Sequence, residues 1–415
     1  MIAKDMINKI ILSTILCSGV ILSWGQSLNS ETEKTLTDGI LNLNLGGKDN
    51  HVRIGGYISA GGHFTEIKND ANSNGLNVDH AFFNVEGFFL HQKLGLFLQA
   101  DFTEGYPLLD AYASYRPVDN LVLTFGQKQT FTNTRDMMLR DQSTANGEHS
   151  VMSKSFNNSG RELGFYAEYR MRSNTVGADF GIAVTSGDGK NSFGSTSADV
   201  DCGGLKYGGR VTIYPNGYFK RGNEYVFYDF ARETSPKVAI GAAFSYNDGA
   251  SNAVGEGHGD FRMYDKEGKL AYPDLRKFSA DILLKWAGFT LLADYTNTTA
   301  TKLQNLYTAA SVASKLQPEE ISQMLALGNG VDVQMGYITK NGWAFNTAYS
   351  YVKPEFAEVE NSALRKNYAW DVGVAKYFCG NTLKLQLLGN YTHYRTVIME
   401  PYKERSVKMN IQLLF

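Results

Sequence analysis

The sequence predicts an all-β fold: a transmembrane antiparallel β-barrel of about 16 strands. Three observations predict it. The chain of 415 residues has 42 Gly, 24 Tyr and 24 Phe but only 8 Pro, a composition typical of strand-rich proteins rather than of disordered chains. Segments with an apolar side chain at every second position recur along the chain. The connections between these segments alternate between short and long, as they do in bacterial outer-membrane barrels.

The amino-terminal residues are expected to be removed before folding. Met1–Gln26 carries two lysines and then the apolar run Ile10–Leu22, which is too short to span a bilayer and is typical of a signal peptide. Residues 27–50 are expected to form a periplasmic segment, and residues 51–415 the barrel. The formal net charge of -2 suggests no polyanionic partner such as nucleic acid.

The last predicted strand, Ser406–Phe415, shows the repeating pattern most clearly. Val407, Met409 and Ile411 alternate with polar side chains, so one face is apolar and the other polar. The same pattern predicts sixteen strands: His51–His63, His80–Leu90, Leu94–Phe102, Leu109–Arg116, Leu121–Gln129, Arg161–Arg170, Val176–Thr185, Lys206–Tyr214, Lys237–Tyr246, Lys277–Trp286, Phe289–Thr296, Val331–Thr339, Trp343–Tyr351, Tyr368–Phe378, Leu383–Tyr394 and Ser406–Phe415.

The faces assigned outward are almost entirely apolar, which a lipid-facing surface needs and a soluble barrel does not. Exceptions include Gln127 and Lys376, both near strand ends. Aromatic side chains near strand ends are expected to form interface girdles. They are Tyr115, Tyr169, Trp286, Tyr337, Trp343 and Tyr377.

Two connections break the alternation of lengths. The alternation predicts a long connection at 103–107, but this one is short. It predicts a short connection at 215–235, but this one is long. Within the long connection 297–329, the sequence from Gln317 predicts a short helix. Cys202 and Cys379 are expected at opposite ends of the barrel, so we predict no disulfide between them.

Two short motifs, Phe125–Lys128 and Ser159–Gly164, resemble segments of the phosphate-selective porin O/P family. Phe125–Lys128 (FGQK) is similar to its Gly-Gln-x-Lys segment, and Ser159–Gly164 (SGRELG) to its Gly-Arg-[Asp/Glu]-x-Gly strand start. The resemblance implies a sixteen-stranded outer-membrane porin, typically a homotrimer, with a constriction loop folded into the lumen. Here that loop would be Thr130–Gly160. Carried over by position, Lys128, Arg140 and Arg161 would lie at or near the constriction, and Arg135 lies in the same loop.

The predicted lumen wall carries both signs of charge. Arg53, Lys206, Arg210 and Lys285 belong to a basic set of about eleven residues, and the inward acidic residues are similar in number. Rings of a single sign set ion selectivity, so this wall does not by itself indicate a phosphate channel. The chain also departs from the family at 129–133, where QTFTN stands in place of Pro-Phe and a Glu.

Catalytic and metal-binding motifs are absent from the sequence. It contains neither HExxH nor GxSxG, so we expect no enzyme, no metal and no cofactor. His149 with Asp136 or Asp141 is the one candidate for hydrolytic chemistry, and a solvated loop histidine is the favoured interpretation.

The resemblance and the pattern together predict passive diffusion of small hydrophilic solutes across a bacterial outer membrane, with anions such as phosphate as candidate solutes. Phe415, the aromatic last residue, is expected to contact the barrel-insertion machinery. Two alternatives stay open: an outer-membrane barrel hydrolase, and a surface adhesin that binds a partner through its long loops.

Overall fold

A computed structural model describes residues 41–44, 50–68, 72–171, 175–191, 203–257, 259–356, 362–378, 382–394 and 402–415. The predicted signal peptide and the two cysteines of the predicted barrel, Cys202 and Cys379, lie outside these residues. In the part of the chain that is described, no helix has the length and apolar character needed to cross a membrane.

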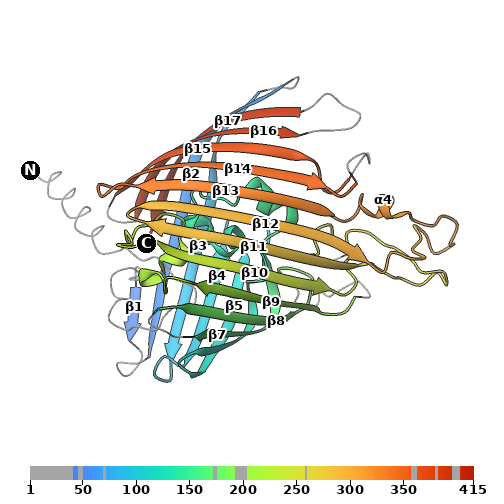
Figure 1. The fold of residues 1–415 in the computed structure, drawn as a ribbon, viewed down its shortest axis with the longest axis horizontal. Helices are drawn as coiled ribbons and strands as arrows, with labels where there is room; N and C mark the ends of the chain where they lie inside the picture. Colours follow the sequence, from blue (N-terminus) through green and yellow to red (C-terminus); the bar gives the residue numbers. More distant parts are fainter. Residues whose placement is uncertain are drawn as a thin grey trace, which may run out of the picture.

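Sixteen antiparallel strands, β2 to β17, close into a barrel (Figure 1). Each strand pairs with the next along the chain, and β17 pairs with β2 to complete the ring. The predicted sixteen-stranded barrel is therefore confirmed. The strands are β2 (His51–Ile67), β3 (Ser73–Phe89), β4 (Leu94–Asp101), β5 (Leu108–Val118), β6 (Leu121–Gln129), β7 (Arg161–Met171), β8 (Gly177–Thr185), β9 (Lys206–Tyr214), β10 (Lys237–Asn247), β11 (Asp274–Trp286), β12 (Phe289–Thr301), β13 (Gly328–Ile338), β14 (Trp343–Pro354), β15 (Asn367–Phe378), β16 (Leu383–Tyr394) and β17 (Tyr402–Leu414).

The ring closes at the carboxy-terminal residue. The N–H of Gly56 donates to the Phe415 carbonyl at 2.7 Å, and the N–H of Phe415 donates to the Gly56 carbonyl at 3.0 Å. A short strand that the sequence pattern did not predict, β1 (Leu41–Asn44), pairs with residues 51–54 of β2. Since β3 occupies the other edge of β2, β1 continues the edge where β17 stops.

The two faces of the wall differ as the alternation predicts. Val407 and Met409 are 51% and 63% exposed, whereas Gln412 is 1% exposed. An apolar outer surface on a closed barrel suits lipid, because closure leaves no unpaired strand edge in the hydrocarbon. One predicted girdle residue is wrong: Tyr377 is buried inside the barrel, where its ring lies 5.8 Å from that of Tyr228.

The two rims of the barrel are unlike. Short turns, such as residues 287–288, lie at one rim, which we call the short-turn rim. Long loops lie at the other, the long-loop rim, which is at the right of Figure 1 with α4 (Pro318–Ile321). The predicted helix after Gln317 is present as this single turn, with a capping box formed by Gln317 and Glu320. In outer-membrane barrels the short turns are periplasmic.

Candidate functional site

The long connection between β6 and β7 runs through the inside of the barrel. Most of residues 130–160 are buried, and they include α2 (Arg135–Met138), η3 (Asp141–Ser143) and α3 (Val151–Phe156). The Thr134 and Ser150 hydroxyls accept hydrogen bonds from the first turns of α2 and α3. We call residues 130–160 the constriction loop.

A row of wall carboxylates receives the start of α2. Asp294 on β12 accepts the backbone N–H groups of Arg135 at 2.8 Å and of Asp136 at 3.2 Å. Its register neighbours on β11 and β13 are Asp281 and Asp332. A carboxylate at a helix start satisfies N–H groups that have no partner within the helix. The wall therefore fixes the loop through its backbone as well as its side chains.

Two of the predicted site residues converge on Asp281. The Arg135 Nε lies 2.6 Å from one carboxylate oxygen, and the Arg210 guanidinium donates to the other. All three side chains are buried. Gly241 leaves the space that Arg210 and Asp281 fill, since a Cβ there would collide with both. This arrangement links α2 to β9 and β11 and makes Arg135 and Arg210 anchors of the constriction loop.

His149 joins the two halves of the constriction loop. Its Nδ1 lies 3.5 Å from Asp136, and its Nε2 lies 3.4 Å from Asp141. Burial lowers the pKa of His149, but the neighbouring carboxylates of Asp136 and Asp141 outweigh burial and raise it. Burial likewise raises the pKa of Asp136, but the nearby His149 and the hydrogen bonds from the Ser150 N–H and the Gln334 amide outweigh that effect and lower it. The sequence-predicted trio is thus assembled as a link within the loop.

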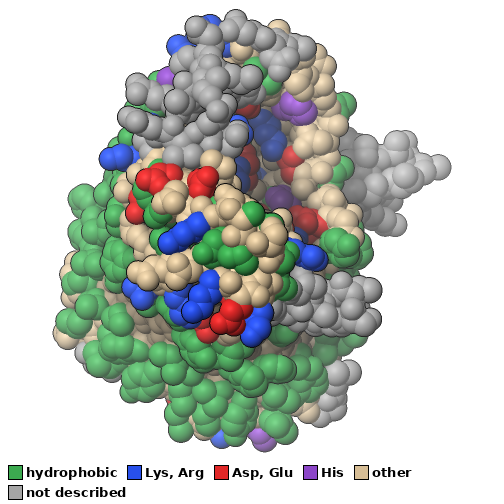
Figure 2. Space-filling model, turned by 90° about the vertical axis from the view of Figure 1, so that its right-hand side faces the viewer, with side chains coloured by type: hydrophobic (Ala, Val, Ile, Leu, Met, Phe, Trp, Pro, Cys, Tyr) green, Lys and Arg blue, Asp and Glu red, His purple; other side chains and the backbone are tan. Residues whose placement is uncertain are grey.

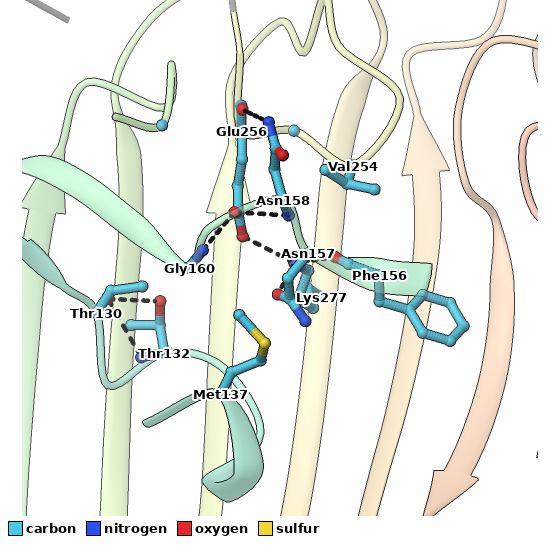
Figure 3. Close-up of polar contacts among 12 residues, drawn as sticks. Thr130, Thr132, Met137, Phe156, Asn157, Asn158, Gly160, Val254, Glu256 and Lys277 are labelled. Atoms are coloured by element: carbon cyan, nitrogen blue, oxygen red, sulfur yellow. Dashed lines mark hydrogen bonds and ion pairs between the residues drawn. The ribbon is translucent and has the colours of Figure 1, made fainter. Parts of the chain in front are cut away.

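The loop's last residues are held by Glu256, from the connection between β10 and β11 (Figure 3). Its carboxylate accepts the N–H groups of Asn158 at 3.0 Å and of Gly160 at 2.9 Å. The Lys277 ammonium lies 3.5 Å from Glu256 and donates to the Phe156 carbonyl at 2.7 Å. Gly160 has a φ of +67°, a conformation that favours glycine.

The constriction loop also reaches the opposite wall. Gln386 on β16 donates to the Ala145 carbonyl at 2.7 Å, and Asn346 on β14 donates to the Asn146 side chain at 2.8 Å. Gly330 on β13 leaves room for α3, because a Cβ there would lie 2.6 Å from Met152. The loop therefore crosses the lumen from β6 and β7 to β13–β16.

One cavity remains on the β5–β9 side of the loop, and we call it the β5–β9 cavity. Its volume is about 120 Å³. It extends to the turn between β5 and β6, so it faces the short-turn rim. Its charged lining residues are Asp110, Arg116, Asp119, Lys128, Arg135, Arg140, Glu168, Arg170, Asp179 and Arg210.

A second cavity of about 230 Å³, the β15–β17 cavity, lies between the loop and the opposite wall. It extends to the ends of β16 and β17 at the long-loop rim. Figure 2 looks onto this rim, and charged side chains line a hollow beside the loops. The charged and histidine side chains that line the cavity are Glu148, His149, Lys154, Asp371, Glu404 and Lys408. None of these was predicted as a constriction residue, because the polar stretch that contains Glu148 and Lys154 has no periodicity to orient them.

Lys128 and Arg140 both line the β5–β9 cavity. The Lys128 ammonium lies 2.6 Å from Glu168 and 5.0 Å from the centre of the Tyr166 ring. The Arg140 guanidinium lies 4.7 Å from the centre of the Phe97 ring, a cation–π contact. Of the four predicted constriction residues, these two keep partly exposed side chains.

The other predicted residues lie in ion pairs or buried contacts. Arg161 is buried 3.2 Å from Asp110, and Lys206 is buried 2.7 Å from Glu162. Arg53 lies 3.6 Å from Glu86, outside both cavities. Lys285 is fully buried, and its ammonium donates to backbone carbonyls of residues 223–228.

Known proteins share the fold of this chain at low sequence identity. DcaP, an outer membrane channel of Acinetobacter baumannii, is 12% identical over 90% of this chain and 99% of its own, with a TM-score of 0.55. Pseudomonas putida OprB is 11% identical over 88% and 94%, with a TM-score of 0.53. OmpT, an outer membrane protein of Vibrio cholerae solved also in a trimer form, is 10% identical over 89% and 99%, with a TM-score of 0.53.

No family model matches the chain, and no curated protein matches it. The similarity to solved structures shows a common fold, the closed β-barrel of these outer-membrane proteins. Together with the closed ring and its apolar outer surface, this fold makes the chain a multi-pass β-barrel of the bacterial outer membrane. The narrower resemblance to the phosphate-selective porin O/P family stays a prediction.

Proposed function

We propose that the protein is a porin through which small hydrophilic solutes diffuse passively. The observation that carries this proposal is a constriction loop, anchored on both walls, with a charged cavity on each side of it. A polar, charge-lined lumen accepts hydrated solutes, and the ions fixed on its wall select among them. No chemical step is required of any residue.

We further propose a preference for small anions, phosphate among them, at the β5–β9 cavity. Six of its charged lining residues are basic and four are acidic, so the local field favours negative solutes. Lys128 and Arg140 keep partly exposed charges there, whereas Arg135 and Arg210 share the carboxylate of Asp281. Lys128 and Arg140 are therefore proposed to favour the permeation of anions. The buried Arg135 and Arg210 are proposed to hold the constriction loop in place.

The reversal potential in a KCl gradient tests this preference. Lys128→Glu and Arg140→Glu should each shift the reversal potential towards cation selectivity, because each changes the cavity charge by two. Lys340→Glu is the matched control, since Lys340 lies exposed in the turn between β13 and β14. Equal reversal potentials for the wild type and the three variants would contradict the anion preference but not the proposed porin function.

The assembly and insertion of the barrel are proposed from the same fold. We propose a homotrimer, as one OmpT structure is described as a trimer form. Phe415 closes the ring at Gly56 and is proposed as the contact for the insertion machinery. Chemical cross-linking of the membrane-embedded protein should yield a band three times the monomer mass, and a monomer alone would contradict the trimer.

A hydrolase is the second candidate, because Asp136, Asp141 and His149 do come together. Asp136 is 1% exposed, so a substrate would have to displace the loop to reach it. His149→Asn separates the candidates: a hydrolase would lose turnover, whereas a porin keeps its conductance. An adhesin is the third candidate function. It would form a plugged or very narrow pore and would therefore show little or no conductance.

A further inference from the structure

We propose that a second inward segment, residues 215–236, is a fixed floor that closes the β7–β15 side of the lumen at the short-turn rim. Solutes then leave through the β5–β9 cavity, past the edge of the floor at Tyr225. This inference rests on the proposed porin function and assigns the pore exit to named residues. It explains why the connection between β9 and β10 is long where a short turn is due.

The floor begins against the ends of β7 and β8. The Tyr218 hydroxyl lies 2.8 Å from the Met171 carbonyl and 3.0 Å from an Asp179 carboxylate oxygen. Its ring packs over Gly177, where an added Cβ would lie 2.5 Å from the ring. A larger residue at 177 would therefore push this end of the floor away from the wall.

The floor then crosses to β11. The fully buried Lys285 ammonium donates to the carbonyls of Asn223 at 2.5 Å, Val226 at 2.5 Å and Tyr228 at 3.2 Å. An ammonium has three donors, and all three are used on the backbone of the floor. Such a contact fixes main-chain conformation rather than one side chain.

A tight turn locks the floor to the short-turn rim. The buried Asp229 carboxylate accepts the Gly288 N–H at 2.8 Å and the Asn223 amide at 2.7 Å. The Arg232 guanidinium donates to the carbonyls of Ile338 and Ala287, at 2.6 Å each. These bonds join the floor to the turn between β11 and β12 and to the end of β13.

The far end of the floor reaches β14 and β15. The Tyr228 hydroxyl donates to Asn346 at 2.8 Å, and the Phe230 ring lies 5.1 Å from that of Tyr377. Phe227 is fully buried over Gly336, where a Cβ would lie 2.5 Å from its ring. Glycines at 177 and 336 thus provide sockets for aromatic rings of the floor, as packed interiors require.

The floor meets the constriction loop inside the barrel. The Phe227 N–H donates to the Ser143 carbonyl at 2.8 Å. Leu139 and Ala145 of the loop share one apolar cluster with Phe219, Phe227 and Tyr228 of the floor. Two segments that enter from opposite rims are therefore packed together on this side of the barrel.

The edge of the floor borders the β5–β9 cavity. Tyr225 lines that cavity beside Arg170, whose guanidinium donates to the Tyr225 hydroxyl at 3.0 Å and lies 3.6 Å from Glu224. An anion leaving the cavity would therefore pass a tyrosine hydroxyl and an arginine. Tyr225 and Arg170 are the residues that we assign to the exit.

Single-channel recording tests the floor directly. Replacing residues 216–235 by a two-residue Asn-Gly turn should raise the conductance roughly two-fold, because the exit then opens on both sides. Unchanged conductance from a folded, heat-modifiable variant would overturn the inference. Absence of conductance in the wild type would instead overturn the proposed porin function, so the two failures are distinguishable.

Cysteine accessibility gives a second test that needs no deletion. In a background with Cys202 and Cys379 changed to Ser, Tyr225→Cys should react with a charged methanethiosulfonate reagent and lose conductance. Phe227→Cys should stay unreactive, because Phe227 is fully buried. Rapid reaction at 227 with an equal loss of conductance would show that solutes pass through the floor, and the inference would fail.

Discussion

Phe227 and Ser143 join the two segments that enter the barrel from opposite rims: the Phe227 N–H donates to the Ser143 carbonyl at 2.8 Å. Residue 143 belongs to the constriction loop and residue 227 to the connection between β9 and β10. A buried backbone hydrogen bond of this kind leaves no water between its partners. The two segments therefore fill this part of the interior, and the two charged cavities lie on either side of the constriction loop.

The anchor at Asp294 should hold the constriction loop still. Asp294→Ala leaves the buried N–H groups of Arg135 and Asp136 without their acceptor, at a cost of about 1–3 kcal/mol for each unsatisfied group. We expect lower stability to urea and noisier open-channel current. Glu319→Ala, at an exposed site in α4, is the control. Identical current noise in both variants would show that Asp294 does not hold the loop.

The link through His149 should make the loop sensitive to pH. The pKa of His149 is raised, so its stabilisation is complete below the unfolded pKa and is lost as pH rises through the folded pKa. The pKa of Asp136 is lowered, so its stabilisation is present above its unfolded pKa and is lost on further acidification. Arg161 also acts on His149 and lowers its pKa.

We therefore expect the open-channel current noise to be lowest in mildly acidic solution and to increase as the pH rises above neutral. Recordings of wild type and His149→Asn between about pH 5 and 9 check this. The variant should lack the rise. A wild-type channel with the same noise across this range would contradict the role of the histidine.

The glycine under α3 should tolerate no side chain. Gly330→Val places atoms where Met152 and Phe156 lie, 2.6 and 2.9 Å from the added Cβ, and overpacking of this kind costs about 1–3 kcal/mol. Gly105→Val is the matched control, since nothing lies within 4 Å of its Cβ. Urea unfolding should separate the two variants, and equal midpoints would argue against the packing described.

The ring closure should depend on the last residue. Deleting Phe415 removes both backbone hydrogen bonds to Gly56 and exposes an edge next to β2. We expect a smaller heat-modifiable fraction after refolding into detergent, measured as the mobility shift between unheated and boiled samples. A conservative change, Phe415→Tyr, keeps both bonds and should fold like the wild type.

The sequence predicts the strands well because lipid imposes a strict pattern on them. All sixteen barrel strands were predicted, and the errors are at the ends. β3 begins at Ser73 rather than His80, and β12 runs to Thr301 rather than Thr296. The residues added to β12 are polar or small, whereas those added to β3 include the exposed Leu76 and Val78 among polar ones. Both extensions lie at the long-loop rim, where strands project beyond the hydrocarbon and a regular apolar face is no longer needed.

The interior is harder to predict because its contacts join residues far apart in the chain. Gln386 and Ala145 are bonded across 241 positions, and no local pattern in either segment indicates the other. Tyr377 illustrates the same limit. An aromatic near a strand end is typical of a girdle, yet this ring packs inward against the floor.

Single-channel conductance of the folded wild-type protein in a planar bilayer tests the central claim most directly. We predict stable open steps, with a reversal potential in a KCl gradient that favours chloride. A folded, heat-modifiable barrel that gives no conductance would contradict the account, because both cavities would then be closed to solutes.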